Sequence, residues 1–229
     1  NDSCISRPAI VFEKTKRICL VGYSCVEERY LPGDLRYAHF TDASSVLGEI
    51  AWLAKQFDEV IVSCHAGNEG LRIPSPYVIS TYRNFIEAGA RCVIGHHSHV
   101  FQPVELYRGG LISYSLGNFV FDLFWDKDAL ASAILDVVLN EDTPYFKLHA
   151  THFSPDYIVE MMPTSMQNQF LYCLRDVGCS LESVTEESYR RALARYEQGN
   201  QTAKYKYFAK HFFEGRTGLK IAFLFQKFS

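Results

Sequence analysis

The 229-residue sequence has no long apolar run, no closely spaced cysteine pair and little net charge. No stretch approaches the ~18 consecutive apolar residues of a membrane-spanning helix, so no such helix is expected within these residues. The seven cysteines are an odd number without ligand-type spacing, which argues against a disulfide scaffold and favours a reducing, cytoplasmic setting. A net charge of −3 gives no reason to expect a nucleic-acid binder.

The sequence does not begin with methionine, and we expect neither a signal peptide nor an internal repeat within these residues. It begins at Asn1, and we expect it to be a piece of a longer protein. Its composition, 48% hydrophobic and 21% charged, is that of a globular domain. The charge is uneven, because residues 189–229 carry nine Lys or Arg against two acids. This basic arm is expected to pack its aromatics on the body, or else to meet an anionic polymer, a membrane face or a partner.

Short apolar runs alternate with helical periodicity through the first hundred residues. The runs predict buried strands at 17–22, 59–64 and 91–95, separated by amphipathic helices at 44–57 and 78–86. Asp42 or Ser44 is the expected N-cap of the first helix, and Gly89 the C-cap of the second. Strand and helix in alternation are typical of an α/β fold.

Later residues predict hairpins and then helices. The hairpins pair 104–107 with 111–116 and 132–139 with 145–152, so the sheet is expected to be mixed. Ser183 and Glu186 form a capping-box pattern before a helix at 186–198, Gly199 is expected to end it, and another helix is expected at 202–214. We divide the chain into an α/β domain, residues 1–160, and a helical basic extension, residues 161–229.

Four histidines follow two successive predicted strands. His65 follows the strand at 59–64, and His96, His97 and His99 follow the strand at 91–95. Because open α/β sheets place their sites at the carboxyl ends of parallel strands, these imidazoles are expected to converge there with Glu69. Such a set suits a borderline-soft divalent cation, zinc, manganese or iron.

His65, His97 and His99 are the predicted metal ligands. His96 is expected to point away from them, because one of two consecutive side chains normally does. A single histidine after a strand is more often structural, so the prediction depends on the cluster. Glu69 is open to three interpretations: a ligand, a carboxylate that orients a ligand, or an exposed loop residue. Arg72 is a candidate anion-binding residue or an ordinary exposed arginine.

Three segments resemble the CapA family of bacterial capsule and poly-γ-glutamate synthesis proteins. They are Val60-Ile-Val-Ser-Cys-His-Ala-Gly-Asn-Glu69, residues 86–103 around Gly95-His-His-Ser-His99, and Ile112-Ser-Tyr-Ser-Leu-Gly-Asn-Phe-Val-Phe-Asp122. CapA proteins are similar in turn to calcineurin-like metallophosphoesterases. The resemblance implies a layered α/β sandwich and two metal ions in the complete site, with His65, His97 and His99 at the later family motifs.

The sequence departs from the family pattern in two ways. Ala66 replaces an aromatic residue, and Ser98 replaces a proline. The early family motifs, a Gly-Asp, an Asn-Leu-Glu and an Asn-Asn-His, have no counterpart. We therefore expect half a metal site here, completed by an upstream segment or a partner chain, and a tendency to self-associate.

The resemblance implies metal-assisted hydrolysis of a phosphoester or an anionic polymer substrate. His96 is the candidate general acid, while Glu69, Arg72 and Asn118 are assigned to substrate binding or to orienting the ligands. Two alternatives remain: a non-catalytic assembly subunit of a polymer synthetase, and a metal-dependent γ-glutamyl amide hydrolase. The family precedent also leaves a membrane-associated or extracytoplasmic location open.

Overall fold

The larger sheet of the molecule is mixed, with a parallel centre. The computed structural model describes residues 8–13, 16–25, 38–139, 142–167, 170 and 181–211. Strands β2, β3, β4 and β6 are parallel, and β1 and β5 pair antiparallel at the two edges. The α/β class with a mixed sheet is thus confirmed. The bounds are β1 Ala9–Glu13, β2 Lys16–Ser24, β3 Glu59–His65, β4 Cys92–His96, β5 Val104–Tyr107 and β6 Gly110–Ser113.

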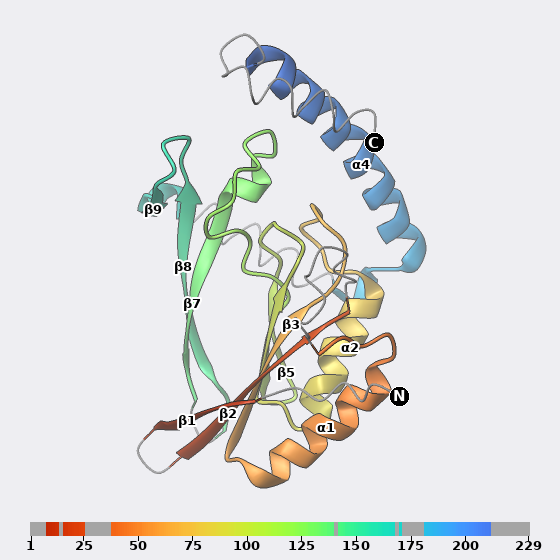
Figure 1. Cartoon of the computed structure of the whole chain (residues 1–229), viewed down its shortest axis with the longest axis vertical. Coiled ribbons are helices and arrows are strands. Elements are labelled where there is room, and N and C mark those ends of the chain that lie inside the picture. The colour runs from red at the N-terminus through yellow and green to blue at the C-terminus, as the bar shows by residue number, and fades with distance from the viewer. Residues whose placement is uncertain are drawn as a thin grey trace, which may run out of the picture.

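Two helices, α1 (Ala43–Gln56) and α2 (Pro76–Glu87), cover one face of this sheet (Figure 1). The predicted N-cap of α1 is present, since the Asp42 carboxylate accepts from the Ser44 backbone N–H at 3.1 Å. Gly89 follows α2 with φ of +113°, and its N–H donates to Ile86 O at 3.0 Å while Ala90 N–H donates to Phe85 O at 3.0 Å. This pair of bonds is a Schellman motif, which satisfies the last carbonyls of the helix.

The main core lies between this sheet and the two helices. Alternate strand residues such as Val21, Val62 and Val93 are buried on the helical side, as period-2 side-chain alternation requires. Helices α1 and α2 supply fully buried partners that include Ile50 and Phe85.

A second antiparallel sheet lies on the other side of the large sheet (Figure 1). It consists of β7 (Ala131–Val138), β8 (Tyr145–Phe153) and β9 (Val159–Met161). Both predicted hairpins are present, β5 with β6 and β7 with β8. The first turns at Arg108 and Gly109, which both have positive φ, 47° and 80°, as a two-residue hairpin turn of primed type needs.

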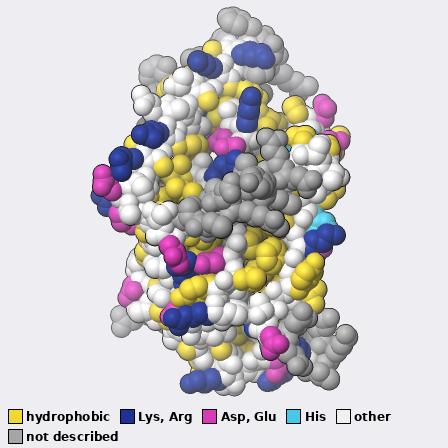
Figure 2. Space-filling model, turned by 180° about the vertical axis from the view of Figure 1, so that it is seen from behind, with side chains coloured by type: hydrophobic (Ala, Val, Ile, Leu, Met, Phe, Trp, Pro, Cys, Tyr) yellow, Lys and Arg dark blue, Asp and Glu magenta, His cyan; other side chains and the backbone are white. Residues whose placement is uncertain are grey.

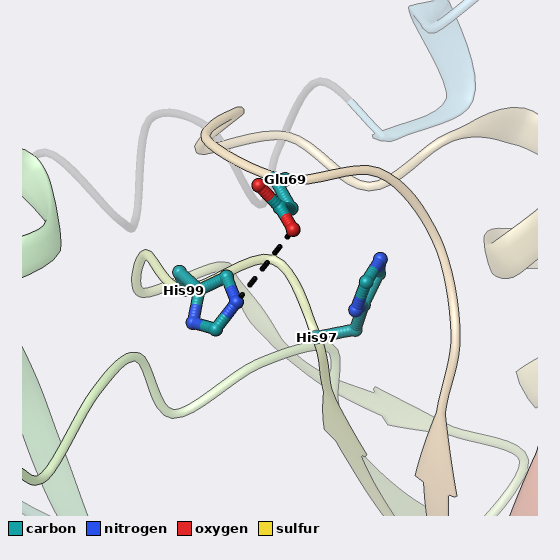
Figure 3. Close-up of side chains that lie close together, drawn as sticks. All are labelled: Glu69, His97 and His99. Carbon is teal, nitrogen blue, oxygen red and sulfur yellow. Dashed lines mark ion pairs between the residues drawn. The ribbon is translucent and has the colours of Figure 1, made fainter. Parts of the chain in front are cut away.

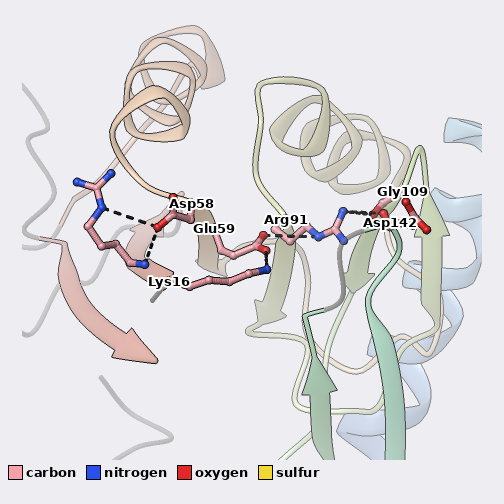
Figure 4. Close-up of polar contacts among 7 residues, drawn as sticks. Lys16, Asp58, Glu59, Arg91, Gly109 and Asp142 are labelled. Carbon is pink, nitrogen blue, oxygen red and sulfur yellow. Dashed lines mark hydrogen bonds and ion pairs between the residues drawn. The ribbon is translucent and has the colours of Figure 1, made fainter. Parts of the chain in front are cut away.

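Charged residues link the strands at the amino ends of the parallel strands (Figure 4). Glu59 lies 2.9 Å from Lys16 Nζ and 3.6 Å from the Arg91 guanidinium. Arg91 also donates to Gly109 O at 3.0 Å and to Asp142 O at 2.9 Å. Glu59 is largely buried, so Lys16 and Arg91 both help to offset the free-energy cost of removing its carboxylate from water.

Three predictions about the ends and caps of the C-terminal helices are wrong. Helix α4 runs unbroken from Glu186 to His211, so Gly199 does not end a helix and 202–211 is no separate one; residues 212–214 lie outside the described part. A glycine costs a helix only about 1 kcal/mol, too little to end one that packs on the body. The capping pair is Thr185 and Ser188, whose side chains accept from each other's backbone N–H at 3.2 and 3.0 Å, rather than Ser183 and Glu186.

Short 3-10 helices lie at Asp128–Leu130 and Leu181–Ser183. Strand β1 was not predicted from the sequence. In the described part of the chain, no helix combines the length and the apolar character needed to cross a membrane.

Candidate metal centre

The predicted histidines lie at the carboxyl edge of the parallel strands. His65 is the last residue of β3 and His96 the last of β4, and the two are directly paired in the sheet register. His97 and His99 follow β4, and Glu69 lies in the loop after β3. The histidines and Glu69 therefore lie at the edge of the sheet where open α/β folds place their functional sites.

The loop after β4 has an unusual backbone. His97 and His99 both have positive φ, 95° and 60°, a conformation that costs a non-glycine residue on the order of 1–3 kcal/mol. Neighbouring bonds hold the loop in place: Ser98 Oγ donates to Val100 O at 2.8 Å, and Gly70 N–H donates to Ser98 O at 2.7 Å. The two imidazoles and the Glu69 carboxylate lie close together in the folded chain (Figure 3).

Glu69, His97 and His99 form a group with the spacing of metal ligands. One potential ligand atom from each lies within 4.8 Å of the other two, and His99 Nε2 is 3.9 Å from Glu69 Oε1. A carboxylate with two imidazoles is a ligand set that a divalent metal ion can accept, while the identity of the metal stays a prediction. The group is open to solvent, since the Glu69 side chain is 63% exposed.

Asn118 orients one of these imidazoles. Its Oδ1 lies 2.8 Å from His99 Nδ1, and because an amide oxygen only accepts, Nδ1 must carry the proton. The Asn118 amide nitrogen donates to Ala129 O at 3.3 Å, which supports this amide orientation. The bond leaves the lone pair of His99 on Nε2, the atom facing Glu69, as a metal ligand needs.

His65 contacts His97 in the structure. The two are joined by a hydrogen bond of 2.9 Å between His65 Nε2 and His97 Nδ1, with ring centroids 4.7 Å apart. Glu69, rather than His65, completes the close group with His97 and His99. The assignment of His65, His97 and His99 as ligands stays a prediction.

His96 is partly buried beside this group. Desolvation, and secondarily the neighbouring His65, lower the pKa of His96, so the neutral imidazole is favoured. A neutral imidazole accepts a proton more readily than it donates one, and the general-acid role stays a prediction.

Arg72, the predicted anion-binding residue, and two strand cysteines lie outside the group of Glu69, His97 and His99. Arg72 extends toward Asp128, with 3.9 Å between guanidinium and carboxylate. Cys64 and Cys92 are buried strand residues, and desolvation raises the pKa of each to about 12. Both remain thiols at neutral pH, and a metal binds the thiolate.

Three aromatic residues near the group were not singled out from the sequence. The Phe121 ring lies 4.9 Å from the His99 ring. From α4, Tyr189 donates to Asn68 Oδ1 at 3.2 Å and Tyr196 donates to Asp126 Oδ2 at 2.8 Å. Phe121 belongs to a segment that resembles the family, but only the folded chain brings the two tyrosines to these loops.

A cavity of about 330 Å³ lies at the opposite end of the sheet. It is lined by side chains of both signs, including Arg91, Arg108, Asp58 and Glu59. The cavity is therefore separate from the histidine group and has no consistent charge.

Comparison with known proteins identifies the family. Residues 5–123, just over half of the chain, match the family described as bacterial capsule synthesis protein PGA_cap. The chain belongs to this family. The match contains His65, Glu69, His96, His97, His99 and Asn118.

Three relatives match over shorter stretches of the chain. The capsule biosynthesis protein CapA of Bacillus anthracis is 42% identical over 92 residues, covering 35% of this chain and 22% of the relative. The PGA biosynthesis protein CapA of Bacillus subtilis (strain 168) is 44% identical over 73 residues, covering 32% and 19%. A Mycobacterium tuberculosis (strain CDC 1551 / Oshkosh) protein named as a probable polyglutamine synthesis accessory protein is 34% identical over 80 residues, covering 35% and 21%.

The matched stretches thus span only about a fifth of these relatives. Among solved structures, a Staphylococcus aureus protein described as a "Putative 5'-Nucleotidase", in complex with alpha-ketoglutarate, superposes with a TM-score of 0.44 and 10% identity. That alignment covers 77% of this chain and 33% of the other.

Proposed function

We propose that this chain is the part of a capsule-synthesis protein that carries ligands of a hydrolytic metal site. The observation that carries the proposal is the group of Glu69, His97 and His99 at the carboxyl edge of the parallel strands. Family membership supports the setting, the synthesis or processing of a capsule polymer such as poly-γ-glutamate. The reaction proposed is hydrolysis of a phosphoester in that setting.

Each residue of the group has a defined role in this proposal. Glu69, His97 and His99 hold a zinc, manganese or iron ion, while Asn118 holds the His99 ring and His65 the His97 ring. A bound divalent ion lowers the pKa of water and polarises a phosphoryl oxygen. Arg72, in the loop after Glu69, would attract an anionic substrate in this proposal. His96 moves a proton next to the site.

We further propose that the site is completed by residues beyond this group. Two divalent cations ~3.5–4 Å apart repel each other strongly unless carboxylates lie between them. Within the described residues, the group contains one carboxylate, that of Glu69. A further carboxylate from an upstream segment or a partner chain would supply the missing negative charge.

The non-catalytic alternative is supported by the names of the relatives. They refer to biosynthesis and to an accessory role in synthesis, not to hydrolysis. A subunit that supports a polymer synthetase could retain the fold and bind a metal without turnover.

The test compares the 229-residue chain with a longer protein that includes its upstream region. Metal content is measured after dialysis, and hydrolysis is measured with bis-p-nitrophenyl phosphate and with a γ-glutamyl anilide. We expect the longer protein to hold more metal and to cleave the phosphoester, with the 229-residue chain weak in both. His99→Ala should remove metal and activity, whereas the matched variant His149→Ala, which loses a histidine paired with Asp136 on the second sheet, should remove neither.

The other outcomes separate the alternatives. Cleavage of the anilide alone would identify an amide hydrolase, and metal binding without either activity would favour the assembly subunit. A longer protein that holds no metal would overturn the proposal.

A further inference from the structure

Helix α4 faces the rest of the molecule with one stripe of side chains. Tyr189, Tyr196 and Ala203 are buried or half-buried and lie seven residues apart, which returns them to the same helix face every two turns. Basic side chains gather along the outer side of α4, at the upper left of Figure 2. The packed stripe therefore faces the loops at the carboxyl edge of the sheet.

Tyr189 contacts the residue before Glu69. Its side chain is only 4% exposed, and its hydroxyl donates to Asn68 Oδ1 at 3.2 Å. Desolvation raises the pKa of Tyr189 to about 12, so the hydroxyl keeps its proton and remains a donor at any physiological pH.

Tyr196 contacts the residue after Glu69. Its ring lies so close to Gly70 that a Cβ added there would be 1.7 Å from Tyr196 Cζ. Gly70 also has φ of +79°, so the position suits glycine both for its backbone and for the ring above it. The Tyr196 hydroxyl donates to Asp126 Oδ2 at 2.8 Å, which joins the Glu69 loop to the segment that follows Asn118.

The Glu69 loop is thus held from two sides. On the side of the loop after β4, Gly70 N–H donates to Ser98 O at 2.7 Å, and Gln102 Nε2 donates to Leu71 O at 2.8 Å. On the side of α4, the loop contacts Tyr189 and Tyr196. The Glu69 side chain itself is mostly exposed, and the loop's attachments must therefore set where its carboxylate lies.

We propose that α4 sets the metal affinity of the site, with Tyr189 and Tyr196 as positioning residues for Glu69. The inference rests on the proposed metal site and goes beyond it by giving a role to a helix outside the family match. Loss of either contact lets the carboxylate sample positions too far from His97 and His99 to bind the same ion. Residues that orient metal ligands change affinity about 10- to 100-fold when removed.

The test measures the dissociation constant for Zn²⁺ or Mn²⁺ by competition with a chromogenic chelator, on the full chain under conditions where it is folded. We expect Tyr196→Phe to weaken binding a few-fold, and Tyr196→Ala or the double variant Tyr189→Phe/Tyr196→Phe to weaken it about tenfold. Tyr205→Phe is the matched control, because Tyr205 is an exposed tyrosine on the same helix, and its affinity should equal that of the unmodified chain.

A second measurement separates positioning from general destabilisation. Each variant is unfolded in urea without metal, and the shift in midpoint caused by saturating metal is recorded. Positioning predicts that Tyr196→Phe weakens metal binding a few-fold while its metal-free midpoint stays nearly unchanged. Equal affinity in all variants would overturn the inference while leaving the metal site intact. If the unmodified 229-residue chain has no measurable affinity, the same variants are compared in the longer protein, and failure of that protein to hold metal would overturn both.

Discussion

Asn118 is the single residue that best tests the geometry of the site. Asn118→Ala removes the acceptor for His99 Nδ1–H, so the ring is free to rotate or to change tautomer. We expect metal affinity to fall about 10- to 100-fold, measured by the same chelator competition. Asn84→Ala, at an exposed position of α2, is the control and should bind as before; an Asn118→Ala chain of full affinity would mean that Asn118 does not orient His99 for metal binding.

Gly95, in the strand that leads to the histidines, is required by close packing. A Cβ there would lie 2.1 Å from Tyr114 O and 2.7 Å from the Tyr82 ring, both in the buried core. Gly95→Ala should lower the free energy of unfolding by about 1–3 kcal/mol. Gly48→Ala on α1, where nothing lies within 4 Å, should instead raise it by about 0.5–1 kcal/mol. Urea unfolding of both variants gives the comparison, and the same sign for the two would contradict it.

At the scale of elements, α4 is held by aromatic contacts more than by its charges. Trp125 lies 5.6 Å from Phe208 and 6.0 Å from Tyr207, measured between ring centroids, with Lys204 Nζ 5.5 Å above the Trp125 ring. The ion pairs of α4 at Arg190 and Arg191 are with Glu186 and Glu187 of the same helix and are exposed. Such pairs contribute only about 0–1 kcal/mol.

A double-mutant cycle tests this view of α4. Trp125→Ala and Phe208→Ala should couple by about 0.5–1.5 kcal/mol in unfolding free energy, and the coupling should persist in 0.5 M salt. Removing residues 200–229 should likewise lower the melting temperature more than high salt does. A coupling near zero, together with a truncated chain of unchanged stability, would show that the basic arm does not depend on the body and is available to an external partner.

At the scale of the whole molecule, the buried thiols make stability sensitive to alkaline pH. Desolvation raises the pKa of both Cys64 and Cys92 from 9.0 to about 12. In the unfolded chain these thiols ionise near pH 9, while in the folded chain they stay protonated, so rising pH favours the unfolded chain. The contribution of each protonated thiol to the free energy of unfolding is fully present below pH 9. It is lost as the pH rises to about 12, by about 1.4 kcal/mol per pH unit for each thiol.

The variant Cys64→Ala/Cys92→Ala should therefore show a shallower loss of unfolding free energy between pH 9 and 11 than the unmodified chain. The difference between the two at pH 7 serves as the reference for the cost of the substitutions themselves. If the unfolding free energies of the two chains fall in parallel across this pH range, the pKa values of the two thiols do not differ between the folded and unfolded chain.

The local elements were largely predictable because their signals are local. Apolar runs, the Asp42 cap, Gly89 after α2 and the glycine turn before β6 depend on residues close in sequence, and the strands and helices lie where these signals indicate. The extent of α4 was not predictable from Gly199 alone, because contacts distant in sequence, such as Trp125 with Phe208, outweigh the small local cost of a glycine.

The pattern of residues along the chain is enough to predict the alternating α/β order, the mixed sheet and the four histidines at one edge, because strand direction and period set which end of the sheet a residue occupies. Which side chains come within ligand distance depends instead on how the folded chain brings distant segments together. It placed Glu69 with His97 and His99, turned His65 against His97, and brought Tyr189 and Tyr196 onto the Glu69 loop. These contacts depend on positive-φ backbone and on pairing across more than a hundred residues, which no local pattern encodes.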